Sequence, residues 1–276
     1  MGYTLLIIQS PKKITVICGP TSTGKTSLAL EMARELNAVI LSADSRQIYK
    51  FMDIGTGKIP VTGEAAVIKK PDHWIINGVP VYGYDLVTPD QTYSAYDFCL
   101  YGRNLINNIV SSGNNLIVVG GTGFYIDSLL GRVTSSNTPP NETLRNELNL
   151  LPLSELQTRL KQLSEELFNK IDNKNKVRII RAIEKLTLPE QKLDIPEFSE
   201  DLSFVQVGLK TVNEKMFSTA DNWTKVIWEK GLIKETQLLI DKGFETSAPL
   251  NGLIYKSAKD YINGVLTESF AIERIQ

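Results

Sequence analysis

The stretch from Ile14 to Thr26, ITVICGPTSTGKT, constrains the fold of this chain more than any other. Its first part, Ile14–Cys18, is a short apolar run rich in β-branched residues, which is typical of a buried strand. Its second part, Gly19–Thr26, matches the spacing G-x-x-x-x-G-K-[ST], and the helix-forming segment Ser27–Leu36 follows it. A strand, a glycine-containing loop and a helix in this order predict a phosphate-binding loop rather than an ordinary tight turn.

Each part of this loop has a role in binding an anion. The glycines let the backbone curl so that successive N–H groups point at the anion, and the helix that follows adds its positive dipole. Lys25 adds a point charge, and the hydroxyl of Thr26 can hold a magnesium ion. The loop predicts a diphosphate or a triphosphate without distinguishing them. Its predicted binding residues are Gly19, Pro20, Thr21, Ser22, Thr23, Gly24, Lys25 and Thr26.

Further apolar runs alternate with helical segments along the chain. The predicted strands after the first one are Ala38–Ser42, Asn115–Val119 and Phe204–Leu209, and a helix is predicted over Ser94–Val110. This alternation predicts an α/β fold like that of the P-loop NTPases, in which a parallel sheet carries helices on both faces. An Asn-Gly pair within Trp74–Tyr82 predicts a hairpin, and Pro80 is expected to place its second arm at a sheet edge.

The composition changes at Ser135–Pro140, and from there to Leu188 the pattern is purely helical. We therefore predict an α/β core over residues 12–137 plus 200–276 and an inserted helical subdomain over residues 138–199. In the last part of the core a helix is expected over Asp221–Asp241, and a helical stretch over Lys256–Gln276. Trp223 and Trp228 are expected to be core residues of an amphipathic helix.

Composition excludes several classes of protein. Thirty basic and 31 acidic residues give a formal net charge of −1, so binding to nucleic acid would require a local basic face. The single histidine, His73, excludes a Cys/His metal cluster, and two cysteines suit a reducing compartment. At the N-terminus the apolar residues precede the lysines, the reverse of a secretory signal, and no run reaches membrane-spanning length. We expect a soluble, cytoplasmic monomer with no membrane partner.

Polar residues follow the predicted strands where a ligand would bind. The carboxyl ends of parallel strands share one edge of a sheet, which places Asp44–Ser45 and Gly120–Thr122 beside the phosphate loop. Asp44 has three possible roles: a magnesium ligand, a helix N-cap or a general base. The strand before Gly120 ends without an acid, which weakens the interpretation as an ordinary ATP- or GTP-hydrolysing enzyme.

Five segments, in this order, resemble the motifs of the tRNA dimethylallyltransferases. They are Gly19–Thr26, Ser42–Tyr49, Met52–Lys58, Tyr93–Phe98 and Gly120–Tyr125, and the resemblance extends more weakly to Gln276. It implies transfer of a dimethylallyl group from dimethylallyl diphosphate to the exocyclic amine of the adenosine 3′-adjacent to the anticodon in tRNA, with Mg²⁺ as cofactor.

The same resemblance implies roles for individual residues. Asp44 would accept the proton of the amine, Thr122 would position the amine, and Lys25 would stabilise the leaving diphosphate. Thr26 would hold Mg²⁺. The helical insertion would face tRNA, in line with its locally basic segment Lys170–Lys185. The residues implied to contact tRNA are Asp44, Ser45, Arg46, Gln47, Thr122, Arg178 and Arg181.

The sequence departs from the family pattern in two places. Two arginines are usual before the element Gly231–Glu235, but their positions hold Thr219 and Trp223, which predicts slow catalysis. Relatives continue beyond the position of Gln276 into an aromatic and arginine-rich helix, so the sequence resembles a fragment or a short member. Three alternatives therefore stay open. They are a P-loop small-molecule kinase or NTPase that binds ATP, an adenine-nucleotide prenyltransferase, and a catalytically weakened tRNA-binding relative.

Overall fold

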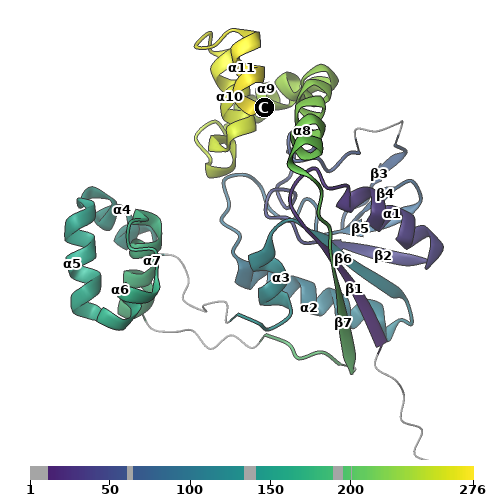
Figure 1. The fold of residues 1–276 in the computed structure, drawn as a ribbon, viewed down its shortest axis with the longest axis horizontal. Helices are drawn as coiled ribbons and strands as arrows, with labels where there is room; N and C mark the ends of the chain where they lie inside the picture. Colours follow the sequence, from purple (N-terminus) through teal and green to yellow (C-terminus); the bar gives the residue numbers. More distant parts are fainter. Residues whose placement is uncertain (1–11, 61–64, 134–140, 189–194, 200) are drawn as a thin grey trace, which may run out of the picture. The chain divides into compact units, whose positions relative to one another are not determined.

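The computed structural model describes residues 12–60, 65–133, 141–188, 195–199 and 201–276. The chain divides into two compact units, the first made of residues 1–133 and 196–276 and the second of residues 134–195 (Figure 1). The segment Ser135–Pro140, where the composition changes, lies outside the described residues. Among the helices that are described, none is both long and apolar enough to cross a membrane.

Within its described residues, the first unit contains one seven-stranded sheet of order β3-β4-β5-β2-β6-β1-β7. Strands β5, β2, β6, β1 and β7 are parallel, which confirms the predicted α/β fold. The strands are β1 Lys12–Cys18, β2 Ala38–Ser42, β3 Val67–Lys69, β4 Trp74–Ile76, β5 Val79–Tyr82, β6 Asn115–Gly120 and β7 Leu202–Gly208.

The predicted hairpin is confirmed, because β4 and β5 pair antiparallel on either side of Asn77 and Gly78. The expectation that Pro80 marks a sheet edge is wrong. Strand β5 also pairs with β2, so it lies inside the sheet. The register with β2 begins at Val81, so the residue that lacks an N–H lies just outside that ladder.

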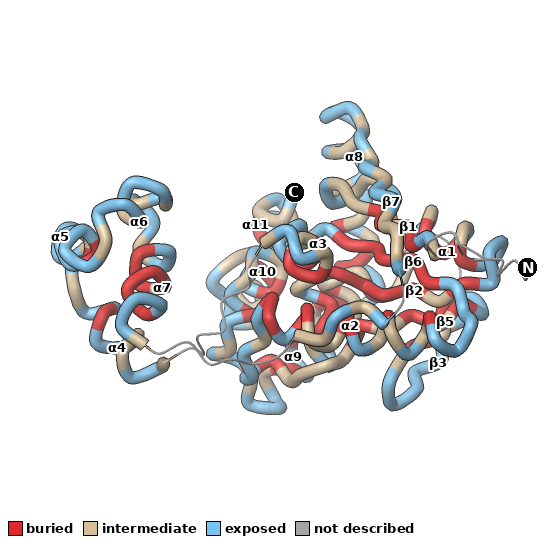
Figure 2. Tube along the Cα trace, turned by 90° about the horizontal axis from the view of Figure 1, so that it is seen from below, coloured by how far each residue is buried: buried red, intermediate tan, exposed pale blue. Residues whose placement is uncertain are grey.

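Helices cover both faces of this sheet: α1 (Lys25–Glu35) on one face, and α2 (Ala95–Ser111) and α3 (Gly123–Leu129) on the other (Figure 1). Alternate strand residues point to opposite faces. The residues that pack with α2 and α3 include Val16, Leu41 and Val118. Those that pack with α1 include Ile17, Ile40 and Ile117. The central strands β1, β2 and β6 are therefore buried on both sides, as Figure 2 shows.

Helix α2 begins where the sequence predicts it. The side chain of Ser94 accepts a hydrogen bond from the N–H of Asp97, and the carboxylate of Asp97 accepts one from the N–H of Ser94. This reciprocal cap fixes the start of the helix. The rings of Phe98 in α2 and Tyr125 in α3 stack with centroids 4.4 Å apart, which joins the two helices.

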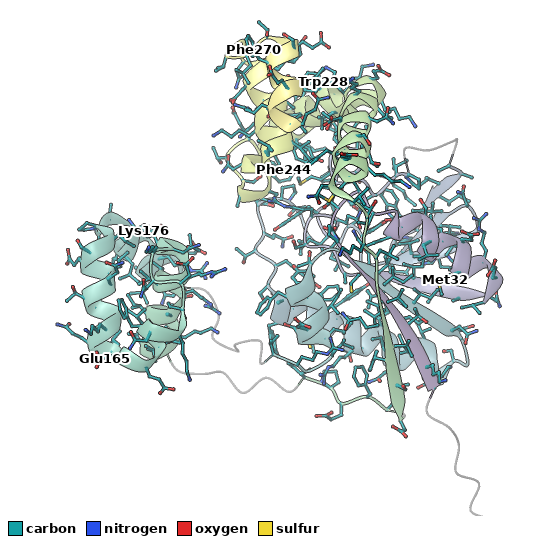
Figure 3. All side chains as sticks on the ribbon, in the orientation of Figure 1. Met32, Glu165, Lys176, Trp228, Phe244 and Phe270 are labelled. Carbon is teal, nitrogen blue, oxygen red and sulfur yellow. The ribbon has the colours of Figure 1, made fainter. Side chains whose placement is uncertain are left out.

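The last part of the first unit is a cluster of helices with its own apolar core. It consists of α8 Asn213–Ile227, η1 Trp228–Leu232, α9 Ile233–Asp241, η2 Ala248–Asn251, α10 Leu253–Ile262 and α11 Glu268–Ile275. The predicted single helix over Asp221–Asp241 is wrong, because the helix begins earlier and breaks at Gly231, whose φ of 118° is not helical. The predicted helical stretch Lys256–Gln276 is confirmed and consists of two helices, α10 and α11. Trp228, labelled in Figure 3, is a core residue as predicted.

The described residues of the second unit form helices α4 Glu142–Leu150, α5 Leu153–Leu163, α6 Glu165–Lys170 and α7 Lys176–Thr187. Their apolar faces form a separate core that includes Leu148, Leu156, Leu160, Ile179 and Ile183. Glu165 and Lys176 mark the starts of α6 and α7 in Figure 3.

Beside this core lies the buried carboxylate of Glu184. It accepts hydrogen bonds from Arg145 Nε at 3.0 Å and Nη2 at 3.1 Å, from the N–H of Asn141 at 2.6 Å, and from Arg181. Burial alone would raise the pKa of Glu184, but these hydrogen bonds outweigh it and hold the pKa below its usual value. The carboxylate therefore stays ionised and ties α4 to α7.

Candidate functional site

Three segments leave the sheet at the same edge. Strand β6 lies between β1 and β2, with Gly120 beside Cys18 of β1 and Val119 beside Ser42 of β2. The phosphate loop, Asp44–Ser45 and Gly121–Thr122 follow these three strand ends. The approach of β2 and β6 is close, since a Cβ on Gly120 would lie 2.1 Å from the carbonyl oxygen of Ala43. Only glycine fits there.

The three segments meet around Gly121. A Cβ on this glycine would lie 3.9 Å from Asp44 Oδ2, 3.9 Å from the carbonyl oxygen of Gly19 and 4.0 Å from Lys25 Nζ. A carboxylate and an ammonium group thus face the same point, and the glycine leaves the space between them open. The structure brings together Lys25, Asp44 and Thr122, the three residues that the resemblance implies are catalytic.

The phosphate loop leads directly into α1. No side chain caps this helix, and its first turn has no acidic residue, so the positive end of its dipole is not neutralised. Lys25 Nζ donates to the carbonyl oxygen of Pro20 at 2.5 Å, as does Thr23 Oγ1 at 2.8 Å. Burial lowers the pKa of Lys25, and the Asp44 carboxylate partly opposes that effect. Thr26 is half-buried, and its hydroxyl makes no hydrogen bond with the described residues.

Asp44 directs one carboxylate oxygen to the backbone and the other to the site. Its Oδ1 accepts the N–H of Arg46 at 2.8 Å, and Oδ2 is the atom near Gly121. The residues that follow form a turn, so Asp44 does not cap a helix. Burial raises the pKa of Asp44, and the N–H of Arg46 and the charge of Lys25 reduce that rise without cancelling it. A carboxylate with a raised pKa is a stronger base.

Thr122 connects the ends of β2 and β6. Its hydroxyl oxygen accepts the N–H of Ser45 at 3.0 Å, and the hydroxyl donates to Ser45 Oγ at 3.3 Å. The N–H of Thr122 donates to the carbonyl oxygen of Ala43 at 3.3 Å. These bonds hold Thr122 beside Asp44 in a fixed orientation.

The side chains of Arg46 and Gln47, the two residues after Ser45, point in different directions. Gln47 is buried: its Oε1 accepts the hydroxyl of Ser42 at 2.7 Å, and its Nε2 donates to the carbonyls of Thr56 and Gly57 at 3.1 and 3.3 Å. Arg46 is exposed, with Nη1 3.5 Å from the carbonyl oxygen of Pro249. Of this pair, only Arg46 presents its side chain to solvent.

The Met52–Lys58 segment is fixed from two sides. Lys58 is fully buried, with Nζ 2.5 Å from Asp85 Oδ1 and 3.0 Å from Asp53 Oδ1. On the other side the carboxylate of Glu235 accepts three successive backbone N–H groups, those of Asp53, Ile54 and Gly55. Three residues of this segment, Met52, Gly55 and Thr56, line a cavity that also reaches the phosphate loop.

A tyrosine-lined cavity of about 330 Å³ lies beside Ser45 and Arg46; its other lining residues are Tyr49, Tyr93, Tyr125, Ala248 and Pro249. Burial raises the pKa of Tyr93 and Tyr125, so both hydroxyls stay protonated at neutral pH. These tyrosines are not among the site residues predicted from the sequence. Tyr93 and Tyr125 belong to two of the segments that carry the resemblance, but an aromatic residue next to a helix predicts a core position equally well.

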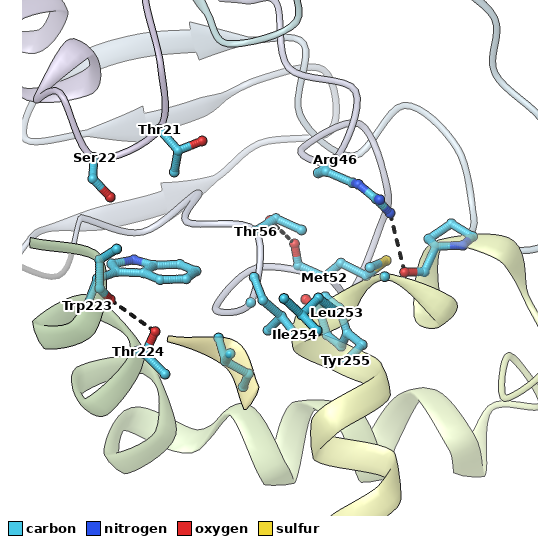
Figure 4. Close-up of a pocket in the computed structure, with 15 residues that line it drawn as sticks. Thr21, Ser22, Arg46, Met52, Thr56, Trp223, Thr224, Leu253, Ile254 and Tyr255 are labelled. Atoms are coloured by element: carbon cyan, nitrogen blue, oxygen red, sulfur yellow. Dashed lines mark hydrogen bonds between the residues drawn. The ribbon is translucent and has the colours of Figure 1, made fainter. Parts of the chain in front are cut away.

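A second cavity, of about 320 Å³, shares Arg46 and Pro249 with the first and reaches the phosphate loop (Figure 4). Thr21, Ser22 and Arg46 line one part of it. The rest is lined by Met52, Gly55, Thr56, Ala220, Trp223, Thr224, Pro249, Gly252, Leu253, Ile254, Tyr255 and Ile275. Trp223, expected to be a core residue, is only partly buried and forms part of this wall.

The two arginines predicted to contact tRNA belong to the second unit and differ in their surroundings. The side chain of Arg178 is 64% exposed, and its Nη1 lies 3.7 Å from Asp172 Oδ2. The side chain of Arg181 is 29% exposed and pairs with the buried Glu184. Arg178 therefore presents its charge to solvent, while Arg181 takes part in the internal ion pair.

Two family models and the similar known proteins all point to the same family. The family model described as IPP transferase matches residues 47–276, and the one described as isopentenyl transferase matches residues 12–77. The tRNA dimethylallyltransferase of Acetivibrio thermocellus is 34% identical over 94% of this chain and 82% of its own length.

Two solved structures are also similar. The full-length tRNA isopentenylpyrophosphate transferase from Bacillus halodurans is 28% identical with a TM-score of 0.64, covering 96% of this chain and 82% of its own. The tRNA isopentenylpyrophosphate transferase from Staphylococcus epidermidis is 30% identical with a TM-score of 0.62, covering 96% and 85%. With a phosphate loop, a carboxylate and a threonine converging at one sheet edge, the chain belongs to the tRNA dimethylallyltransferase family.

Proposed function

We propose that this protein transfers a dimethylallyl group from dimethylallyl diphosphate to the exocyclic amine of the adenosine 3′-adjacent to the anticodon in tRNA. The observation that carries the proposal is the convergence at Gly121, where Lys25 Nζ and Asp44 Oδ2 lie 4.0 and 3.9 Å from one point. This reaction needs a cation for the leaving diphosphate and a base for the amine within reach of each other. Family membership supports the same activity.

The phosphate loop would hold the diphosphate. As the carbon–oxygen bond breaks, negative charge grows on the diphosphate, so Lys25 and the N-terminus of α1 would bind it more tightly in the transition state. Gly19–Thr26 would surround the phosphates. The diphosphate leaves with both electrons of the broken bond, and the allyl carbon forms its new bond to nitrogen.

Mg²⁺ fits this site as a partner of the substrate. The described residues contain no group of three or more His, Cys, Asp or Glu side chains that could hold a metal. Thr26 offers a hydroxyl without another partner among them, and Mg²⁺ commonly binds through one or two protein ligands, waters and substrate phosphates. Bound there, Mg²⁺ would supply further positive charge to the diphosphate.

Asp44 would act as the general base and Thr122 would help to position the amine. The exocyclic amine of adenine is a poor nucleophile because its lone pair is delocalised into the ring. Asp44 Oδ2 would accept the amine proton as the new bond forms, and a base of this kind contributes about 10²- to 10⁴-fold to a rate. The raised pKa of Asp44 suits that role.

The tyrosine-lined cavity would receive the adenosine. A base must leave its stack before an enzyme can modify it, and unstacked bases bind by stacking on aromatic rings. Tyr49, Tyr93 and Tyr125 line this cavity beside Ser45, which is hydrogen-bonded to Thr122. An adenine there would lie next to the proposed base.

The basic helical unit would bind the tRNA backbone, with Arg178 as the exposed contact. Arg46 and Ser45 would contact the nucleotides near the site, whereas buried Gln47 would hold the Thr56–Gly57 carbonyls in place. Thr219 and Trp223, at the positions of two family arginines, would make the reaction slow. We further propose that the protein acts in the cytoplasm as a monomer.

The test is mass spectrometry of adenosine in tRNA after incubation with the protein, Mg²⁺ and dimethylallyl diphosphate. We expect an added C5H8 mass on one adenosine of the anticodon loop, and none with Asp44→Ala. Modification of free adenine nucleotide but not tRNA would contradict the tRNA substrate. ATP hydrolysis coupled to a phosphorylated product would favour a kinase, and tRNA binding without turnover would indicate a weakened relative.

A further inference from the structure

Helix α2 holds the first unit's ends of both connections to the helical unit. The outgoing connection leaves the first unit after Val133, and the incoming connection re-enters it at Pro196. Arg103 of α2 is buried between them. Its guanidinium donates from Nε to the carbonyl oxygen of Leu129 at 3.1 Å and from Nη1 to that of Pro196 at 3.3 Å. One side chain therefore binds the outgoing and the incoming chain at the same point.

The surroundings of Arg103 fit a guanidinium on both sides. On the outgoing side Gly131 has a φ of 71°, in the left-handed region, and a Cβ there would lie 3.0 Å from Arg103 Nη2. On the incoming side the guanidinium carbon lies 4.9 Å from the centre of the Phe198 ring, in a cation–π contact. A planar fork of donors can reach two carbonyl oxygens at once, so arginine suits this position and lysine does not.

Asn107, one helical turn further along α2, anchors the incoming connection alone. Its Nδ2 donates to the carbonyl oxygen of Glu197 at 2.9 Å, and its Oδ1 accepts the N–H of Ser199 at 3.0 Å. Without Arg103 and Asn107, the incoming chain would first be hydrogen-bonded to the sheet where β7 begins, at Leu202. The two side chains of α2 therefore shorten the connection.

The helix that these contacts fix also belongs to the candidate site. Leu129 is the last residue of α3, which begins directly after Thr122, and Tyr125 of α3 lines the tyrosine-lined cavity. The Sγ of Cys99 in α2 donates to the carbonyl oxygen of Ser128 at 3.1 Å, beside the Arg103 contact. Both connections are thus held by the pair of helices that also holds Thr122 and Tyr125.

We propose that Arg103 and Asn107 are positioning residues for the tRNA substrate. By anchoring both connections to α2, they limit where the helical unit can hold RNA and so raise the effective concentration of the bound adenosine at the sheet edge. The inference rests on the proposed function, in which the helical unit binds the tRNA backbone. Effective concentration falls roughly as the −3/2 power of connection length once the connection exceeds the span it must bridge. Release of the anchors would therefore weaken tRNA binding and leave donor binding unchanged.

Four variants of α2 test this inference. Arg103→Ala releases both connections, and Asn107→Ala releases only the incoming one. Asn104→Ala, at an exposed position of the same helix, is the surface control. Val110→Ala is the stability control, because Val110 is buried and takes part in none of these side-chain hydrogen bonds. It should lower the melting temperature without releasing either connection.

Steady-state kinetics gives kcat and KM for tRNA, and calorimetry gives the affinity of unreactive dimethylallyl thiodiphosphate. We expect Arg103→Ala to raise KM for tRNA about three- to tenfold and Asn107→Ala to raise it less. The value of kcat should change by less than about twofold, because only binding of tRNA is weakened. Donor affinity should be unchanged in every variant, and Asn104→Ala and Val110→Ala should keep the wild-type KM.

A second measurement detects the anchoring itself. Relaxation of backbone amide nuclei gives a rotational correlation time for each unit, taken from α1 in the first and α5 in the second. Arg103→Ala should shorten the correlation time of the second unit, because a unit on longer connections tumbles more independently. Lower stability alone does not have this effect, so Val110→Ala should match the wild type.

A wild-type KM for tRNA in Arg103→Ala, or an equal rise in Val110→Ala, would overturn this inference and leave the proposed function standing. Unchanged correlation times in Arg103→Ala would also overturn it. If Arg103→Ala does not fold, Asn107→Ala decides through the same two measurements. If the wild type transfers no dimethylallyl group, the proposed function fails, and filter binding of tRNA then decides this inference in place of KM.

Discussion

The carboxylate of Glu235 accepts a hydrogen bond at 2.7 Å from the backbone N–H of Ile54, a residue far away in the sequence. The same carboxylate accepts the N–H groups of Asp53 at 2.8 Å and Gly55 at 3.0 Å, and the hydroxyl of Tyr255 at 2.7 Å. One side chain of α9 thus holds the loop that forms a cavity wall and fixes Tyr255 of α10 beside it.

Glu235→Gln should therefore destabilise the first unit. The substitution keeps the shape but removes the charge and turns an N–H₂ group toward backbone donors. Hydrogen bonds to a charged group are worth about 1.5–3 kcal/mol each, so we expect a loss of about 2–4 kcal/mol. Urea unfolding measures this loss of unfolding free energy. Glu229→Gln, at an exposed position of η1, is the control and should change little. Equal stability of both variants would contradict the role of Glu235.

Activity should depend on pH through Asp44 and Lys25. Because burial raises the pKa of Asp44, its base form is lost already above the ordinary value of about 4 as the pH falls. Because burial lowers the pKa of Lys25, its charge is lost below the ordinary value of about 10.5 as the pH rises. The profile of kcat/KM against pH should be bell-shaped. Asp44→Asn should lower the rate about 10²- to 10⁴-fold and remove the acidic limb; a profile that keeps this limb would exclude Asp44 as the base.

Gly121→Ala should impair the reaction without unfolding the protein. The added methyl group would lie 3.9 Å from Asp44 Oδ2 and 4.0 Å from Lys25 Nζ, in ordinary contact with both but within the space that the reacting groups need. We expect a loss of activity of about tenfold or more with the melting temperature preserved. Gly123→Ala is the control, because a Cβ there has no neighbour within 4 Å. If the two variants are equally active, the space at Gly121 is not the reaction site.

The two arginines of α7 should give opposite results. Arg178→Ala should weaken tRNA binding and reduce its salt dependence while leaving stability unchanged, since its side chain is 64% exposed. Arg181→Ala should lower stability, because it removes a partner of buried Glu184. Filter binding at several salt concentrations and thermal unfolding separate the two effects. Loss of tRNA binding from Arg181→Ala alone would reverse these assignments.

Local pattern was enough to predict much of the fold. Apolar runs marked the central strands β1, β2 and β6 and the edge strand β7, and an Asn-Gly pair marked the β4–β5 hairpin. The break at Gly231 was missed because helix-forming residues flank it on both sides and a lone glycine is tolerated in a helix. The position of β5 was missed because Pro80 stands at the point where its ladder with β2 begins.

Part of the candidate site could also be predicted from the sequence, and part of it could not. Gly19–Thr26, Asp44 and Thr122 follow strand ends, so topology alone brings them to one edge. The cavity walls combine side chains from distant helices, such as Trp223 of α8 and Tyr255 of α10. Which of those side chains meet depends on tertiary packing, which the spacing of residues along the chain does not encode.

The second unit has its own core, which affects how substitutions in one unit act on the other. The described residues that pack with Leu148, Leu156, Leu160 and Ile183 all belong to that unit. On the proposed function, in which this unit binds the tRNA, surface substitutions on its helices would alter which RNA is preferred without disturbing the chemistry at the sheet edge. Substrate choice and bond-making would then be two independent traits for selection or engineering.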